Sequence, residues 1–98
     1  MRYIWDNYIN RGGQVIGIEI KINIPFDAGK LTDQVWEKAQ DVSNDYKTMV
    51  YEDSTDALFI VRFEHEESAN KVDDSFYSFA TYLNNRFLTY EVQAYEGN

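Results

Sequence analysis

The segment VIGIEIKINI, residues 15–24, places an isoleucine at every second position. Successive side chains of a β-strand point to opposite faces of a sheet, so this alternation predicts a strand with one apolar face. The intervening residues, Gly17, Glu19, Lys21 and Asn23, form a second face that is polar. We therefore expect a half-buried strand whose isoleucines point into the core.

The period changes after Pro25, where apolar residues recur at helical spacing. A helix is expected over residues 28–46, with Asp27 as its N-cap. Its apolar stripe consists of Leu31, Val35, Ala39, Val42 and Tyr46.

The next segments, TMVYE (48–52) and ALFIVRFEHE (57–66), predict a short and a long strand joined by a tight turn at 53–56. The long strand should bury Phe59, Val61 and Phe63. The two strands should form a hairpin.

A second helix should follow, capped by Ser68. Its apolar stripe consists of Ala69, Val72, Phe76, Phe79, Ala80, Leu83 and Phe87. LTYEVQAYE, residues 88–96, alternates again and predicts a last strand.

The expected order β-α-β-β-α-β is typical of the ferredoxin-like α+β sandwich, in which an antiparallel sheet carries two helices on one face. We expect one domain over residues 1–98, with the ferredoxin-like core at 14–97. Residues 1–13 fit either an extra N-terminal strand that forms a hairpin or a short helix with a turn. The strand is favoured because Tyr, Ile and Trp prefer strands.

Composition narrows the class of protein. The 98 residues contain no cysteine, which excludes disulfides and thiolate chemistry, and the net charge of −8 disfavours direct binding to nucleic acid or to anionic membranes. No segment has the pattern of a signal peptide or a membrane span, so a cytoplasmic location is expected.

The polar face of the expected sheet does not predict an RNA-binding platform. Ferredoxin-like RNA binders stack bases on aromatic residues of the two central strands. Those positions here hold Gly17, Glu19, Lys21, Ile60, Arg62 and Glu64. Glu19 and Lys21 are instead expected to pair across the strands with Arg62 and Glu64.

Other candidate sites are also weak. RGGQ (11–14) is more typical of a hairpin turn than of a phosphate-binding loop, and His65 is the only histidine, which is too few for the usual zinc sites. The acidic pairs Glu52–Asp53 and Asp73–Asp74 are adjacent residues, whose side chains diverge. We therefore expect no catalytic site, cofactor or metal.

One pattern stands out on the first expected helix. Asp33, Glu37, Asp41 and Asp45 are spaced four residues apart, opposite the apolar stripe. Like charges at this spacing destabilise a helix by roughly 0.2 to 0.5 kcal/mol per pair. Lys30 and Lys38 should relieve part of the repulsion through Asp33 and Asp41, and Trp36 lies at the margin of the acidic and apolar arcs, where it could anchor an interface or cover the core edge.

These observations favour a non-catalytic domain that presents the four carboxylates and Trp36 to a basic protein, for example a nucleic-acid-binding enzyme. In charge and size alone the chain resembles acidic nucleic-acid mimics, including phage inhibitors of restriction or CRISPR enzymes.

Two alternatives remain open at this point. One is a self-associating module, such as a homodimer, with Val15, Ile60 and Tyr95 as contacts. The other is a small dimeric ferredoxin-like enzyme that uses His65, Arg62 or a tyrosine.

Overall fold

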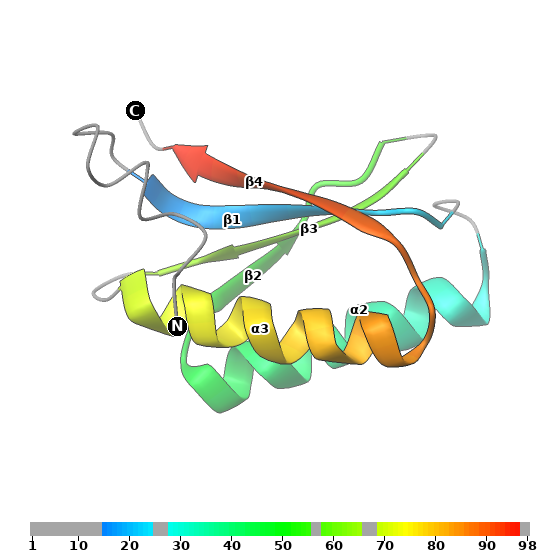
Figure 1. The fold of residues 1–98 in the computed structure, drawn as a ribbon, viewed down its shortest axis with the longest axis horizontal. Coiled ribbons are helices and arrows are strands. Elements are labelled where there is room, and N and C mark those ends of the chain that lie inside the picture. The colour runs from blue at the N-terminus through cyan, green and yellow to red at the C-terminus, as the bar shows by residue number, and fades with distance from the viewer. Residues whose placement is uncertain (1–14, 25–27, 56–57, 66–68, 97–98) are drawn as a thin grey trace.

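The computed structural model describes residues 15–24, 28–55, 58–65 and 69–96. It confirms the β-α-β-β-α-β order of the ferredoxin-like sandwich (Figure 1). The elements are β1 (Val15–Ile22), α2 (Lys30–Tyr46), β2 (Met49–Glu52), β3 (Phe59–Glu64), α3 (Ala69–Asn85) and β4 (Tyr90–Glu96). The strand or helix expected within residues 1–13 and the Ser68 cap lie outside the described residues.

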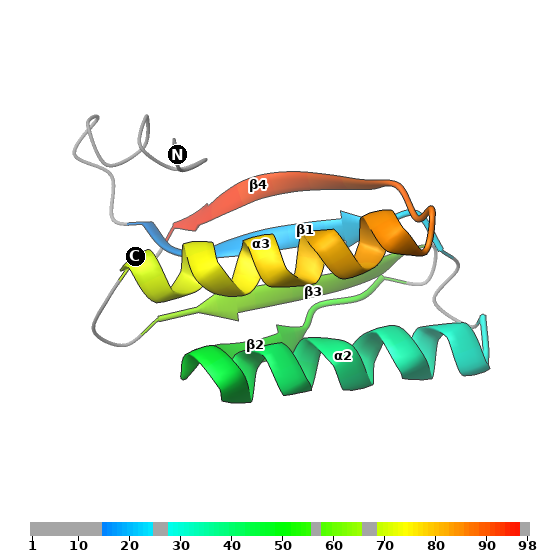
Figure 2. The ribbon, with the colours of Figure 1, turned by 60° about the horizontal axis from the view of Figure 1, so that its bottom comes forward.

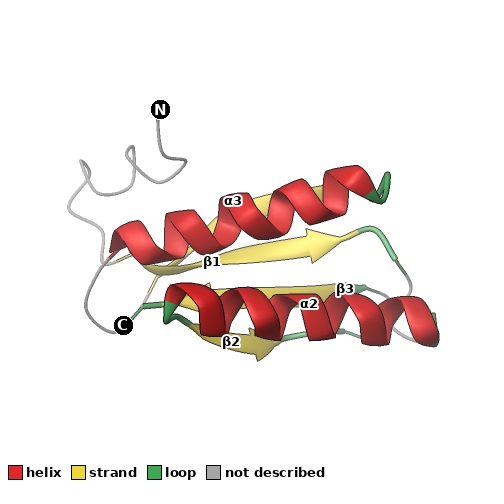
Figure 3. Ribbon diagram, turned by 90° about the horizontal axis from the view of Figure 1, so that it is seen from below, coloured by secondary structure: helices red, strands yellow, loops and turns green. Residues whose placement is uncertain are grey.

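The four strands form one antiparallel sheet in the order β2-β3-β1-β4. The central strands β1 and β3 align Ile20 with Val61, and Ile20 is also opposite Val92 of the edge strand β4. Both helices cover the same face of this sheet and run side by side (Figures 2 and 3). The other face of the described sheet carries neither helix, and we call it the open face.

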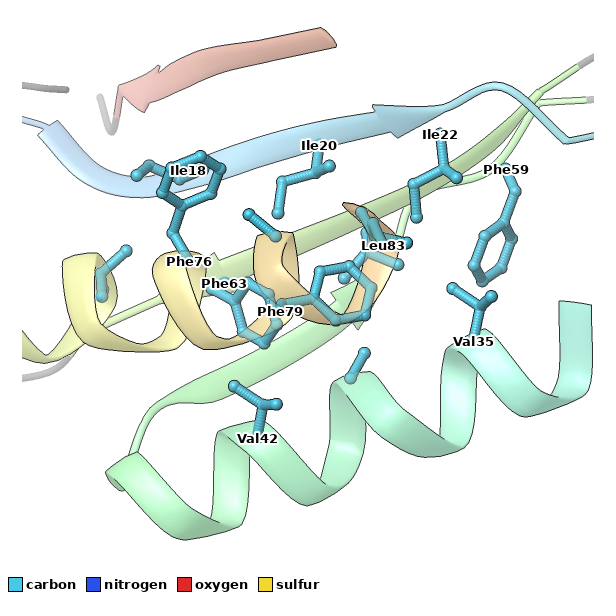
Figure 4. Packing of buried hydrophobic residues seen from close by; sticks show 14 of the residues in the cluster. Ile18, Ile20, Ile22, Val35, Val42, Phe59, Phe63, Phe76, Phe79 and Leu83 are labelled. Atoms are coloured by element: carbon cyan, nitrogen blue, oxygen red, sulfur yellow. The ribbon is translucent and has the colours of Figure 1, made fainter. Parts of the chain in front are cut away.

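The core lies between the sheet and the helices, as the alternation of β1 predicts (Figure 4). Ile18, Ile20 and Ile22 are fully buried, and so are the three predicted β3 residues Phe59, Val61 and Phe63. The helices contribute the buried residues Val35, Ala39, Val42, Val72, Phe76, Phe79, Ala80 and Leu83. Burial of these apolar side chains is the main force that holds the helices on the sheet.

The ends of the helices differ from the prediction in two places. α2 begins at Lys30 and its N-cap is Gly29, with φ 65°, so the expected Asp27 cap is wrong. Glycine adopts this positive φ without steric cost, which explains why the helix starts there. Phe87, expected within the buried stripe of the second helix, lies beyond the end of α3 and is 93% exposed.

Candidate protein-binding surface

The packing of α2 determines which of its side chains reach solvent. Val35, Ala39 and Val42 are fully buried against the core, so the opposite side of the helix faces outward. All four predicted carboxylates, Asp33, Glu37, Asp41 and Asp45, are exposed there. We call these four residues the acidic row.

The geometry of an α-helix sets the spacing of the acidic row. Each step of four residues advances about 6 Å along the axis and rotates about 40° around it. The row therefore extends about 18 Å and winds across the outer side of α2. A partner would meet it as a slanted line of charges on one rigid element.

The expected relief of the acidic row by lysines is not observed. Lys38 does not pair with Asp41, because its ammonium lies 5.8 Å from the centre of the Tyr82 ring on α3. Within the described part of the chain, no lysine or arginine forms an ion pair with any member of the row, and this includes Lys30. The four charges are thus presented to solvent without neutralising partners among these residues.

Trp36 has a mixed environment. Its indole is partly buried and packs against the core cluster, and only part of the ring is exposed. This agrees with its expected position between the apolar and acidic arcs of α2. The residue supports the edge of the core and leaves a partial aromatic surface beside the row.

The open face of the sheet differs from the expected charge pairing. Glu19 lies opposite Arg62 in the register, yet Arg62 binds two other carboxylates. Its Nη1 donates to Asp53, and its Nε donates to Glu64 at 2.7 Å. Glu19 instead accepts a hydrogen bond from Gln93 Nε2 at 3.0 Å, so the expected pairing of Glu19 with Arg62 is wrong.

Two tyrosines of the edge strands complete this arrangement. The guanidinium carbon of Arg62 lies 4.3 Å from the ring centre of Tyr95 on β4 and 4.9 Å from that of Tyr51 on β2. We call Arg62, Tyr51, Tyr95, Asp53 and Glu64 the Arg62 cluster. Burial lowers the pKa of Arg62, but the hydrogen bond to Glu64 and the charges of Asp53, Tyr95 and Glu64 outweigh it and raise the pKa above its ordinary value.

The sequences of the two central strands do not reveal the Arg62 cluster, because its two tyrosines lie on the edge strands. Tyr51 and Tyr95 occupy alternate positions of the edge strands that point to the same face, and this period was readable from the sequence. Their rings are in contact with the arginine, so they do not form a free stacking platform for bases. The cluster joins β2, β3 and β4 across the open face.

The other candidate residues that the structure describes do not converge on a reactive site. Asp73 is fully buried while Asp74 is exposed, as expected for adjacent helical residues that point in different directions. Among the described residues, no group of three or more His, Asp or Glu side chains is arranged to hold a metal. His65 follows the end of β3 and is half-buried, and RGGQ lies outside the described ranges.

The outer surface between the two helices forms a groove of about 580 Å³. Tyr46, Tyr77 and Tyr82 line it together with Lys38 and Asp74. Arg86, at the end of α3, lies 5.1 Å from the Tyr82 ring centre and donates to Gln34 at 3.0 Å. The groove is thus polar and aromatic, and its lysine, Lys38, lies against the same Tyr82 ring as Arg86.

Two of the three residues expected to mediate self-association, Ile60 and Tyr95, are covered in the folded domain. Ile60 is only 7% exposed and the Tyr95 ring lies against Arg62, so neither presents a free apolar surface. The side chain of Val15 is not described. Any self-association through the described surface therefore needs other contacts.

None of the described helices is long and apolar enough to cross a bilayer. No protein-family model, curated protein or solved structure matches the chain. The exposed surface of the domain is therefore the guide to its function.

Proposed function

We propose that the protein is a non-catalytic binding domain that presents the acidic row to a basic protein partner. The observation that carries this proposal is the exposure of four carboxylates along one helix without ion pairs to the described lysines and arginines. Such a line of charge suits a cationic groove, because complementary charge increases the rate of encounter and fixes the orientation of binding.

The energetics support this proposal. Three like-charged i, i+4 contacts oppose the helix by roughly 0.2 to 0.5 kcal/mol each. Asp45 also lies in the last turn of α2, where the helix dipole disfavours a negative charge and where the helix has no basic residue. Stability alone would favour lysines at some of these positions, so the row lowers the stability of the helix that carries it.

We further propose that the partner is a nucleic-acid-binding protein and that the domain acts in the cytoplasm as an inhibitor that occupies a phosphate-binding groove. An inhibitor of a restriction or CRISPR enzyme would be one example of this activity. The support is the net charge of −8 and the fixed spacing of the row, which together give the domain the charge character of a nucleic acid. DNA should then compete with the domain for the partner.

The proposal can be tested with two charge-matched variants. In the first, the acidic row is changed to the corresponding amides. In the second, Glu19, Glu52, Asp74 and Glu91 are changed to amides, so both variants have a net charge of −4 (−8 plus four). The immobilised variants and the wild type are used to capture proteins from cell lysate at low and high salt, with and without duplex DNA.

The proposal predicts capture of a basic protein that is lost with the row variant, high salt or DNA and is retained by the control variant. Titration of the purified partner should then give a dissociation constant that rises with salt. An equal loss of capture by both variants would show that net charge alone is responsible, which contradicts a specific role for the row. Capture that is insensitive to both salt and the row would contradict the proposal.

A further inference from the structure

Phe87 is the most exposed large apolar side chain of the described residues. It is 93% exposed, whereas the next most exposed aromatic residues, Tyr51 and Tyr46, are 40% and 38% exposed. Phe87 also has φ 59°, in the left-handed region that L-residues with a side chain rarely adopt. The position is therefore unfavourable both for the backbone and for the solvation of the ring.

The turn around Phe87 is nevertheless well formed. The Phe87 N–H donates to the Asn84 carbonyl and the Leu88 N–H donates to the Leu83 carbonyl, each at 3.0 Å. This is the usual termination of a helix by a left-handed residue, at which glycine is preferred. Leu88 packs against the core and fixes the geometry. The fold determines the left-handed position, and a phenylalanine occupies it in place of glycine.

A hollow lies at the same end of the molecule. It has a volume of about 500 Å³ and is lined by Lys21, Asn23, Leu58, Thr89, Tyr90 and Glu91. Thr89 is two residues from Phe87, and its carbonyl accepts a hydrogen bond from the Asn23 N–H at 2.9 Å. Figure 1 shows this end at the right, where α3 turns into β4.

The hollow is suited to an aromatic ring. A cavity of about 150 Å³ is sufficient for benzene, so this hollow is large enough for a phenyl group. Leu58 offers apolar contact, and the Lys21 ammonium can lie against a ring face. Lys21 and Glu91 have opposite charges. When two copies of the chain meet through this surface, each copy therefore presents both a positive and a negative side chain, and the contact is not purely repulsive.

We propose that Phe87 inserts into this hollow of a second copy of the chain, which forms a two-fold symmetric dimer. A two-fold axis between the ring and the hollow places each Phe87 in the hollow of the other copy, because a two-fold interface uses the same surface twice. The two contacts are equivalent, and each buries the exposed ring. This interface is separate from the acidic row and does not depend on the proposed function.

Salt distinguishes this association from binding to a basic partner. Two chains of net charge −8 repel each other, so screening by salt should strengthen the dimer. Salt should weaken the binding of a cationic protein to the acidic row. The two proposals thus predict opposite responses to salt.

Sedimentation velocity of the purified protein, from low to high micromolar concentration at two salt concentrations, measures the association. Phe87→Asn removes the ring but retains a residue that tolerates the left-handed conformation. Thr89→Glu fills the hollow and places a carboxylate near the negative face of the incoming ring. Lys47→Asn is the matched control, because Lys47 has φ 57° at the end of α2, at the opposite end of the molecule.

Loss of one central aromatic contact weakens binding by about 30-fold, which corresponds to about 2 kcal/mol, so loss of both should weaken the dimer by on the order of 1,000-fold. Phe87→Asn and Thr89→Glu should each be monomeric alone. Their mixture retains one intact contact and should associate about 30-fold more tightly than either variant. Lys47→Asn should dimerise like the wild type.

The inference is overturned by a wild-type protein that stays monomeric throughout the concentration series at both salt concentrations. It is also overturned if Phe87→Asn dimerises like the wild type. A mixture of the two monomeric variants that does not associate would show that the ring does not enter the hollow. Each result is independent of whether the acidic row binds a partner.

Discussion

Replacement of Arg62 should produce the largest loss of stability from any charged position on the open face. The Arg62 side chain is 13% exposed and binds Glu64, whose side chain is 15% exposed, and Asp53, whose side chain is 44% exposed. The shielded Glu64 contact contributes about 1.5 to 2 kcal/mol, and the more exposed Asp53 contact contributes at most about 1 kcal/mol. The two tyrosine contacts add about 0.5 to 1 kcal/mol each.

Arg62→Met should therefore lower the free energy of unfolding by about 3 kcal/mol, which corresponds to roughly 12 to 24 °C in Tm for a domain of this size. Arg62→Lys retains the charge but not the planar guanidinium between two rings, and it should lose about half as much. Urea denaturation measures both values. Because the pKa of Arg62 is raised, its contribution is fully present at neutral pH and is lost only in strongly alkaline solution.

Lys21→Met is the control, because Lys21 lies on the same face and forms no ion pair with a described residue. It should change the free energy of unfolding by less than about 0.5 kcal/mol. A double-mutant cycle between Arg62→Met and Tyr95→Leu should give a coupling of about 0.5 to 1 kcal/mol. The reasoning is refuted if Arg62→Met costs less than about 1 kcal/mol or if Arg62→Lys is as stable as the wild type.

Four further predictions concern stability. Conversion of the acidic row to amides should stabilise the fold by about 0.6 to 1.5 kcal/mol in urea denaturation at low salt, since three repulsive contacts are removed, and the gain should shrink at high salt. Gly17→Ala should destabilise by about 2 kcal/mol or more, because the added Cβ would lie 2.2 Å from the Phe63 carbonyl oxygen, and a neutral result in thermal denaturation would contradict this contact. Leu83→Ala should cost about 2 to 5 kcal/mol in urea because the side chain is fully buried. Phe87→Asn should raise the stability of the monomer by about 1 kcal/mol, as measured by chemical denaturation at low protein concentration, and a loss would show that the ring is buried or the backbone unstrained.

Much of the fold could be predicted because its signals are local. The alternating isoleucines predicted β1, and the helical spacing of Val35, Ala39 and Val42 predicted both α2 and its buried side. The same periodicity placed the acidic row on the exposed side. The boundaries were less accurate, since the start of α2 depends on the conformation of Gly29 and not on a side-chain cap.

The sequence by itself determined the order of the elements and the face that each one buries, because the period of apolar residues depends only on neighbours along the chain. Only the tertiary structure decided which groups meet across elements: Arg62 lies between Tyr51 and Tyr95, and Lys38 lies on Tyr82. The physical reason is that several carboxylates and rings could satisfy each cation, and the choice depends on sheet register and helix packing. Those distances exist only once the core has assembled.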